Sequence, residues 1–237
     1  MRLEAVIRLF ATVVLAASAF GCAVQLYRFS LQKTKPSPPI TAILIIGVTA
    51  LIAGLQFVFP DVLTAFRRNR EALLAGEWWR MLTPLFVQAL GLWQCCINGV
   101  GAVIVCPLAE RFYGKRLLAL YFVPGILGEV FAYQWGPNGA GSSLGIAGVM
   151  GGLFAFTFFH RSEISRSARV FSIFGIASAV ALSFSRDNHG PPILIGVLLA
   201  SLMMIFWPNA QGGANGRQPF SSATNRMSEA AASRRSP

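Results

Sequence analysis

Polar side chains of several kinds lie at or near the ends of apolar segments of this chain. Gln94 and Asn98 are four residues apart, on one face of a predicted helix. Ser142 and Ser143 open a second apolar segment, and His189 precedes a third. A serine, an imidazole and amide donors are the nucleophile, the general base and the oxyanion stabilisers of an acyl-transfer site. These residue types therefore predict serine-based chemistry, provided that the fold brings the three segments together.

The segment after Ser143 suits such a nucleophile. The first N–H groups of a helix lack intrahelical partners, and the helix dipole favours negative charge at that end. Glycines around the serines would let this helix pack closely on its neighbours; they are Gly139, Gly141, Gly145, Gly148, Gly151 and Gly152. The alternative is a glycine-rich turn with capping hydroxyls before a close-packed helix. Since Asp187 is only two residues from His189, we predict no carboxylate placed to orient the imidazole, and therefore a Ser-His dyad.

The composition says which kind of fold must hold these residues. The 237 residues are 54% apolar and only 12% charged, with a net charge of +11 and a mean hydropathy of +0.58. A soluble domain carries about 25% charged residues, so the chain is predicted to be a polytopic membrane protein. Helices satisfy their own backbone hydrogen bonds in lipid, which predicts an all-α bundle. The uncharged apolar runs predict seven spans: 9–27, 40–59, part of 81–109, 117–135, 141–159, 170–185 and 191–207.

The Lys and Arg residues predict the direction of the spans. With the N-terminus outside, thirteen of the twenty lie on the inner side and seven on the outer side. The helices that start at Ser142, at His189 and before Gln94 then all run inward, so their polar residues share one depth near the outer face. The run from Leu9 to Cys22 has an alternative reading as a secretory signal. Cleavage there would leave the direction of the remaining helices unchanged.

Three regions are expected along the chain. Residues 1–39 form an extra N-terminal transmembrane helix and a basic linker, and residues 40–207 form a six-helix core. Residues 208–237 form a basic tail, predicted to be disordered because it lacks apolar periodicity. No metal-ligand spacing or phosphate-binding loop is present in the sequence, so we predict no metal, no cofactor and no nucleic-acid partner.

Four motifs in the core resemble those of the rhomboid intramembrane serine proteases, over roughly residues 76–207. The segment from Gly76 to Phe86 contains Trp79 and Arg80 and is similar to the Trp-Arg segment of the first rhomboid loop. The other matches are a Glu-Arg-x-x-Gly turn, a Gly-x-Ser motif with glycines behind it, and a histidine followed seven residues later by glycine. Their residues here are Glu110, Arg111 and Gly114; Gly141, Ser143, Gly148 and Gly151; His189 and Gly196.

The resemblance implies a six-helix rhomboid core and an endopeptidase without a cofactor. Ser143 would be the nucleophile and His189 the general base. Asn98 would be an oxyanion donor, and Gln94 stands where many rhomboids have a histidine. Trp79 and Arg80 would anchor the first loop in the outer leaflet, much as an interfacial aromatic and basic belt does. The implied substrates are single-span membrane proteins with helix-weakening residues near the cut, in a bacterial cell membrane or an organellar membrane.

Two departures from the family pattern leave alternatives open. Leu144 follows the serine where the family usually has glycine. After His189 come Gly190, Pro191 and Pro192 in place of a plain glycine pair. Because proline suits the first turn of a helix, the last helix is predicted to begin just after His189. A rhomboid-like protein that binds membrane helices without cutting them is the main alternative, and a small transporter is another. Glu129 is the acidic residue that comes nearest to mid-membrane, the sign expected of a transporter.

Overall fold

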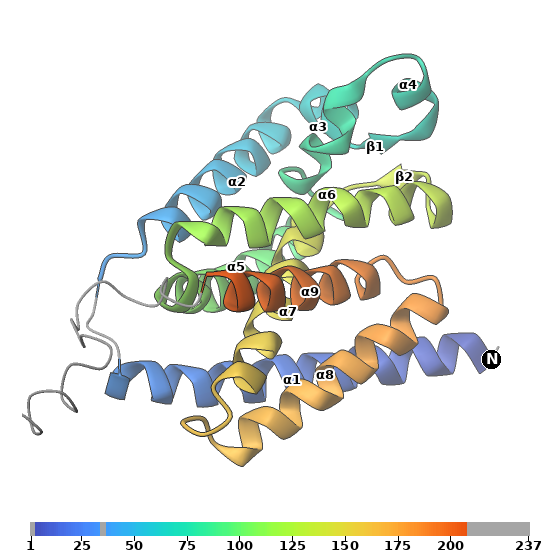
Figure 1. The fold of residues 1–237 in the computed structure, drawn as a ribbon. Helices are drawn as coiled ribbons and strands as arrows, with labels where there is room; N and C mark the ends of the chain where they lie inside the picture. Colours follow the sequence, from blue (N-terminus) through green and yellow to red (C-terminus); the bar gives the residue numbers. More distant parts are fainter. Residues whose placement is uncertain (1–2, 34–36, 208–237) are drawn as a thin grey trace, which may run out of the picture.

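The computed structural model describes residues 3–33 and 37–207, and it is built almost wholly of helices. The seven long ones are α1 (Leu3–Lys33), α2 (Ile40–Val58), α5 (Gly91–Tyr113), α6 (Leu117–Trp135), α7 (Ser143–Phe159), α8 (Arg166–Phe184) and α9 (Gly190–Phe206). They form one bundle, with the N-terminus and the connection between α8 and α9 at the same end (Figure 1). The predicted basic tail lies outside the described residues.

The helices agree with the predicted spans, and α1 and α8 differ most at their ends. α1 extends beyond 9–27 on both sides. As predicted, only part of 81–109 belongs to a long helix: α5 begins at Gly91, and two short 3-10 turns precede it, η1 (Trp78–Met81) and η2 (Thr83–Leu85). α8 is longer than predicted, since it starts at Arg166 and not at Val170; the Ser165 hydroxyl caps it by accepting from the Ala168 N–H. The predicted start of this span was therefore four residues too late.

Length and hydropathy identify the membrane-spanning parts. Among the described residues, four helical stretches are long and apolar enough to cross a bilayer: Glu4–Lys33, Ile40–Val58, Gly91–Trp135 and Arg166–Phe184. The third, of 45 residues, contains both α5 and α6, which are joined by the turn η3 (Gly114–Arg116). α7 and α9 are shorter apolar helices of 17 residues each. The chain is thus an all-α, multi-pass integral membrane protein.

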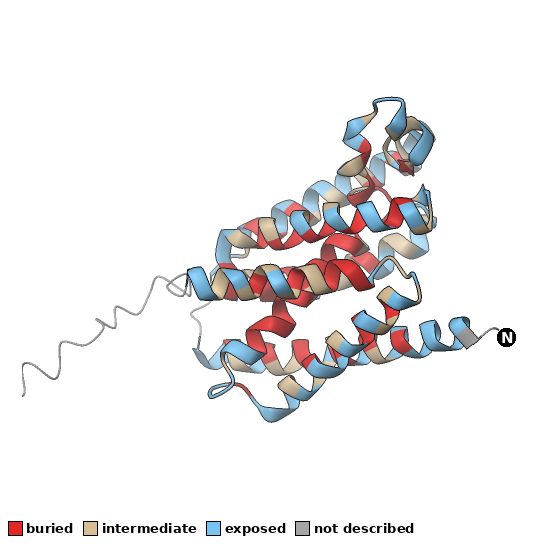
Figure 2. Ribbon diagram, turned by 45° about the vertical axis from the view of Figure 1, so that its right-hand side comes forward, coloured by how far each residue is buried: buried red, intermediate tan, exposed pale blue. Residues whose placement is uncertain are grey.

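α7 is the central helix of the bundle. It contacts α5, α6, α8 and α9, and it also touches α1. Figure 2 shows α7 as almost continuously buried, whereas the outer helices alternate buried and exposed residues. A helix surrounded in this way needs small residues at its contacts. At Gly148 an added Cβ would collide with Pro124 and the Leu120 carbonyl of α6.

The segment between α2 and α5 folds into a small cap over one end of the bundle (Figure 1). It contains α3 (Pro60–Phe66), α4 (Arg70–Leu74) and the strand β1 (Arg68–Asn69), which pairs antiparallel with β2 (Asn138–Gly139). This two-residue ladder was not predicted. Beneath it, Arg68 Nη1 lies 2.6 Å from Glu129 Oε2 of α6, and both side chains are buried. Glu129 is therefore half of an ion pair that holds the cap on the bundle.

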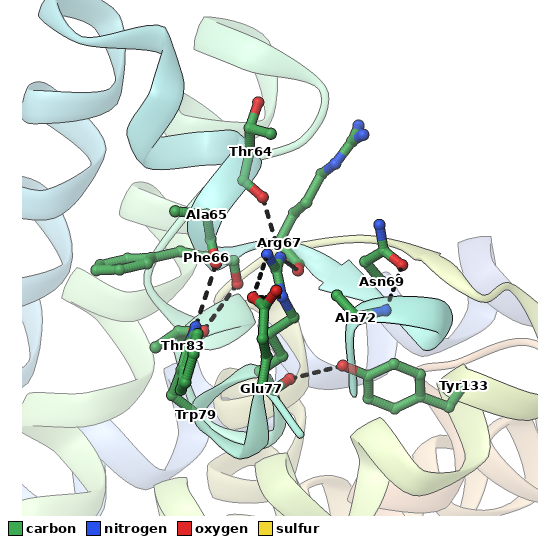
Figure 3. A network of polar contacts seen from close by, with 11 residues as sticks. Thr64, Ala65, Phe66, Arg67, Asn69, Ala72, Glu77, Trp79, Thr83 and Tyr133 are labelled. Atoms are coloured by element: carbon green, nitrogen blue, oxygen red, sulfur yellow. Dashed lines mark hydrogen bonds and ion pairs between the residues drawn. The ribbon is translucent and has the colours of Figure 1, made fainter. Parts of the chain in front are cut away.

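Arg80 organises the interior of this cap. Its guanidinium donates to the Thr64 and Arg67 carbonyls at 3.0 and 2.8 Å and to the Glu77 carboxylate at 2.7 Å. Figure 3 shows these acceptors together with Thr83 and Tyr133, whose hydroxyls donate to the Phe66 and Arg80 carbonyls. Arg80 is only 6% exposed, so it lies inside the loop and not in a lipid-facing belt as one reading expected. Trp79, half exposed, donates from Nε1 to Ala65.

The Glu-Arg turn at the opposite end joins α5 to two other helices. Both Glu110 carboxylate oxygens accept from α2, from the backbone N–H groups of Thr41 at 2.9 Å and Ala42 at 2.7 Å. α2 has no side-chain cap from its own N-cap residue, so Glu110 supplies one and also complements the helix dipole. Arg111 donates to the Ser30 hydroxyl of α1 at 3.0 Å.

Replacement of Glu110 by Ala is expected to lower the free energy of unfolding by about 1–2 kcal/mol, because two N–H groups at the start of α2 lose their acceptor. Thermal unfolding in detergent measures the change. Glu163→Ala is the matched control, since its carboxylate makes an exposed pair with Lys33 at 3.6 Å, worth less than about 1 kcal/mol. Equal losses in the two variants would contradict the capping role.

α1 packs along α8 over much of its length and also contacts α5 and α7. Its buried residues combine small side chains, Ala11, Cys22 and Ala23, with two leucines, Leu15 and Leu26. At Gly21 a Cβ would overlap the Phe171 ring of α8. Near the N-terminus, Arg8 Nη2 donates to the Ser185 carbonyl at 2.7 Å. The extra helix is therefore an integral part of the bundle.

Candidate active site

Ser143 and His189 face each other at the end of the bundle beneath the cap. Ser143 is the first residue of α7, and His189 is the N-cap residue of α9. The distance from His189 Nε2 to Ser143 Oγ is 3.1 Å. That is hydrogen-bond distance between a nucleophile and a general base. The two helix starts adjoin because α7 and α9 pack against each other along their lengths.

The packing of α7 on α9 depends on backbone contact at two glycines. A Cβ on Gly196 would overlap the Gly148 carbonyl, and a Cβ on Gly151 would overlap the Ile193 carbonyl. Gly141 is equally confined, because a Cβ there would overlap the Gln94 amide. These glycines let the helices approach closely enough for the serine and the imidazole to meet.

Asp187 also reaches the histidine, and here our prediction that no carboxylate would orient the imidazole was wrong. Asp187 Oδ1 lies 2.8 Å from His189 Nδ1 and accepts the His189 backbone N–H at 3.0 Å. The short turn between α8 and α9 folds the carboxylate back onto the following residues, as Asp side chains commonly do in turns. We expected the two-residue spacing of Asp187 and His189 to prevent this contact. In the turn between α8 and α9, that short spacing instead brings the carboxylate onto the imidazole.

Asn98 lies at the base of the site, in a buried polar network. Its Nδ2 donates to Gln88 Oε1 at 2.7 Å, and Gln88 Nε2 donates to the Ser142 hydroxyl at 3.1 Å. Gln88 is paired twice with Gln56 of α2, through its N–H at 2.8 Å and its carbonyl at 2.9 Å. The amide nitrogen of Asn98 has a second hydrogen that this network does not use.

Gln94 lies one helical turn nearer the N-terminal end of α5 than Asn98. Its Oε1 accepts the Leu90 N–H at 2.8 Å, and its Nε2 donates to the Ala140 carbonyl at 2.9 Å. The side chain thereby holds the segment between β2 and α7 that leads into Ser142 and Ser143. Like Asn98, it retains one amide hydrogen.

Two cavities meet at the serine and the histidine. The larger, of about 370 Å³, has mostly apolar walls from α1, α5 and α7, and Asn98, Ser143 and His189 line it. The smaller, of about 190 Å³, is more polar; Ser143, His189 and Gln94 line it together with Arg68, Glu129 and Asn188. The structure therefore brings all four predicted site residues around one point, with Asn98 toward one cavity and Gln94 toward the other.

The two departures from the family pattern have defined places. Leu144 is buried and forms part of the wall of the polar cavity. α9 begins at Gly190, just after His189, as predicted, and Pro191 and Pro192 occupy its first turn. Both prolines are buried, and Pro192 packs closely on Gly128 of α6, where an added Cβ would lie 3.2 Å from the proline ring. The proline pair thus fixes the position at which α9 begins.

Charged side chains from several elements lie close to the serine and the histidine. Asp187 and His189 belong to the site, the Arg68–Glu129 pair lines the polar cavity, and Arg8 approaches from α1. Within the described parts of the chain, no three His, Cys, Asp or Glu side chains gather as they would around a metal ion. His160, the other histidine, is at the far end of α7 and stacks on Phe156.

The fold and the site together define a class: a multi-pass helical membrane protein with a serine and a histidine paired below one end of its bundle. A model of the Rhomboid domain matches residues 75–215. The chain belongs to the rhomboid family. It is 30% identical over 131 residues to the rhomboid protease GluP of Bacillus subtilis (strain 168), and 32% identical over 117 residues to the putative rhomboid protease YdcA of the same organism. The matched segments cover 54% and 48% of this chain but only 26% and 58% of those relatives.

Proposed function

We propose that this protein is an intramembrane serine endopeptidase that cuts a peptide bond in or near a transmembrane helix of its substrate. The observation that carries the proposal is the 3.1 Å approach of His189 Nε2 to Ser143 Oγ at the start of α7. Family membership and the names of the two relatives support protease chemistry in general.

In the first step, His189 Nε2 takes the Ser143 proton while Oγ forms a bond to the carbonyl carbon of the substrate. The carbonyl oxygen becomes an oxyanion at the positive end of α7, where the first backbone N–H groups are free to donate. Asn98 and Gln94 flank this point with their remaining amide hydrogens. The C–N bond then breaks, and the His189 proton passes to the leaving amine, which leaves an acyl ester on Ser143.

In the second step, His189 removes a proton from water, and the hydroxide oxygen bonds to the ester carbon. The bond to Ser143 Oγ breaks, and the proton returns from Nε2 to Oγ, which releases a carboxylic acid and restores the serine. Water needs a hydrated route to the ester. The cavity that contains Arg68, Gln94 and Asn188 provides polar walls for it.

The shape of the site favours a substrate that comes from the membrane. The larger cavity beside Ser143 is lined mostly by apolar side chains, which suits the residues of a transmembrane segment next to the scissile bond. At about 1.5 Å per residue the 17 residues of α7 span about 25 Å, which is less than the ~30 Å hydrocarbon core. The serine at its start would then lie below the membrane surface. A single-span protein with a locally unwound helix fits these conditions.

Cleavage of a single-span reporter protein by the purified chain in lipid vesicles tests the proposal. Mass spectrometry of the products should locate one cut within or beside the reporter's span. Wild type and Ser143→Ala that release product at the same rate would contradict it. A folded wild-type protein that captures the reporter but never cuts it would favour the alternative, a rhomboid-like protein that binds membrane helices.

A further inference from the structure

We propose that Asp187 is a positioning residue of this site, which completes a Ser143–His189–Asp187 arrangement in place of a simple dyad. The inference extends the proposed protease function and rests on it. Its basis is a continuous line of contacts: Oδ1 to Nδ1 at 2.8 Å on one side of the imidazole, and Nε2 to Oγ at 3.1 Å on the other.

The line of contacts determines which nitrogen carries the proton. A carboxylate can only accept, so the Nδ1 atom that faces Asp187 must carry the hydrogen. Nε2 of a neutral imidazole is then a bare acceptor directed at the Ser143 hydroxyl. This is the tautomer that a general base requires. When His189 takes the serine proton, the adjacent carboxylate also stabilises the imidazolium that forms.

The backbone holds Asp187 where it can act. Its N–H donates to the Leu182 carbonyl at 2.9 Å, and the preceding Arg186 has a φ of 55°, in the left-handed region that few residues other than glycine adopt. Oδ1 accepts two hydrogen bonds from the same residue, one from the backbone and one from the ring of His189. A left-handed residue and these paired contacts are typical of a turn with one defined geometry.

The charges around Asp187 favour its ionised form. Burial alone would raise the pKa of its carboxyl, but the hydrogen bonds from His189 and the nearby Arg8 guanidinium outweigh burial and lower that pKa. The carboxylate is therefore charged at neutral pH, and its bond to the imidazole is lost only as the pH falls through the lowered pKa. Other charged groups near the histidine are Arg186 in the same turn and the Arg68–Glu129 pair in the polar cavity.

Three variants separate positioning from support of the fold. Asp187→Asn is expected to lower kcat by about 10²-fold, less than the ~10⁴-fold loss in buried triads, because the His189 side chain is 46% exposed to solvent. Asp187→Glu should recover part of the rate. Asp61→Asn, an exposed carboxylate at the start of α3, is the matched control and should stay within about 2-fold.

A second measurement does not depend on activity. Nitrogen-15 NMR of the histidine ring in a His160→Gln background, where His189 is the remaining histidine, should show the proton on Nδ1 at pH 8. A proton on Nε2 would overturn the inference whether or not the protein cleaves. So would an Asp187→Asn variant that cleaves at the rate of Asp61→Asn. A wild type that does not cleave, but carries the proton on Nδ1, would contradict the proposed function alone.

Discussion

Replacement of Ser143 by Ala is expected to reduce reporter cleavage by at least about 10⁴-fold, because the residue whose oxygen would form the acyl ester is gone. His189→Ala should cost a similar factor, since no other base lies within reach of Oγ among the described residues. The double variant should be no slower than either single one, because residues that act as a unit give strongly non-additive losses. Initial rates in lipid vesicles measure all three.

The neighbouring hydroxyl provides the control for this experiment. Ser142 is buried and accepts from Gln88, so Ser142→Ala should lose one hydrogen bond, about 0.5–1.5 kcal/mol of stability. Cleavage should persist. If Ser142→Ala abolished cleavage while Ser143→Ala retained it, the assignment of the nucleophile would be wrong. An organophosphorus reagent that labels activated serines gives an independent reading, since labelling should depend on Ser143 and His189.

Gly196→Ala is expected to cause a large loss of stability. Its Cβ would overlap the Gly148 carbonyl of α7, and backbone, unlike a flexible side chain, can move only if the helices separate. Overpacking of this kind costs about 3 kcal/mol or more, which corresponds to a fall of roughly 6–12 °C in Tm. Separation of α7 from α9 would also lengthen the Ser143–His189 contact, so cleavage should fall with stability.

The same substitution at Gly47 is the matched control. Gly47 is in the middle of α2, and a Cβ there would meet nothing within 4 Å. Since Ala favours helix over Gly by up to about 1 kcal/mol, Gly47→Ala should be neutral or slightly stabilising. Thermal unfolding in one detergent compares the pair. A Gly196→Ala protein as stable as Gly47→Ala would show that the close contact of α7 and α9 is not required.

The transmembrane helices could be predicted because lipid imposes a simple rule on sequence. Uncharged runs bounded by Arg, Lys or Pro predicted seven helices, and the start of α9 followed from Pro191 and Pro192. The cap between α2 and α5 could not be predicted in the same way. Its order comes from side chains that bond to distant backbone, such as Arg80 to Thr64 and Arg67, and no periodicity in the sequence records such contacts.

The candidate site also has residues that could be predicted from the sequence and contacts that could not. Ser143 and His189 could be predicted from their places at helix starts, and the structure puts them within hydrogen-bond distance. Asp187 was discounted, because spacing along the chain does not reveal a turn that folds a carboxylate back onto its neighbour. From the sequence, Glu129 was considered as an acidic residue near mid-membrane, of the kind expected in a transporter. Its partner Arg68 is 61 residues away, and only the pairing of β1 with β2 brings the two together. Gln88 links Gln56 of α2, Asn98 of α5 and Ser142 at the N-cap of α7, and spacing along the chain does not reveal that these three residues come together.

The position of α1 affects how Ser143 can be reached from the lipid bilayer. It lies on α8 and forms one wall of the cavity beside Ser143, through residues such as Ala16, Ala19 and Phe20. Lipid tails on that side therefore meet a protein helix before they meet the serine. Under the proposed function, a substrate helix that approached from this side would have to pass α1 before it reached Ser143. The first helix would then limit access to the serine from that side of the bundle.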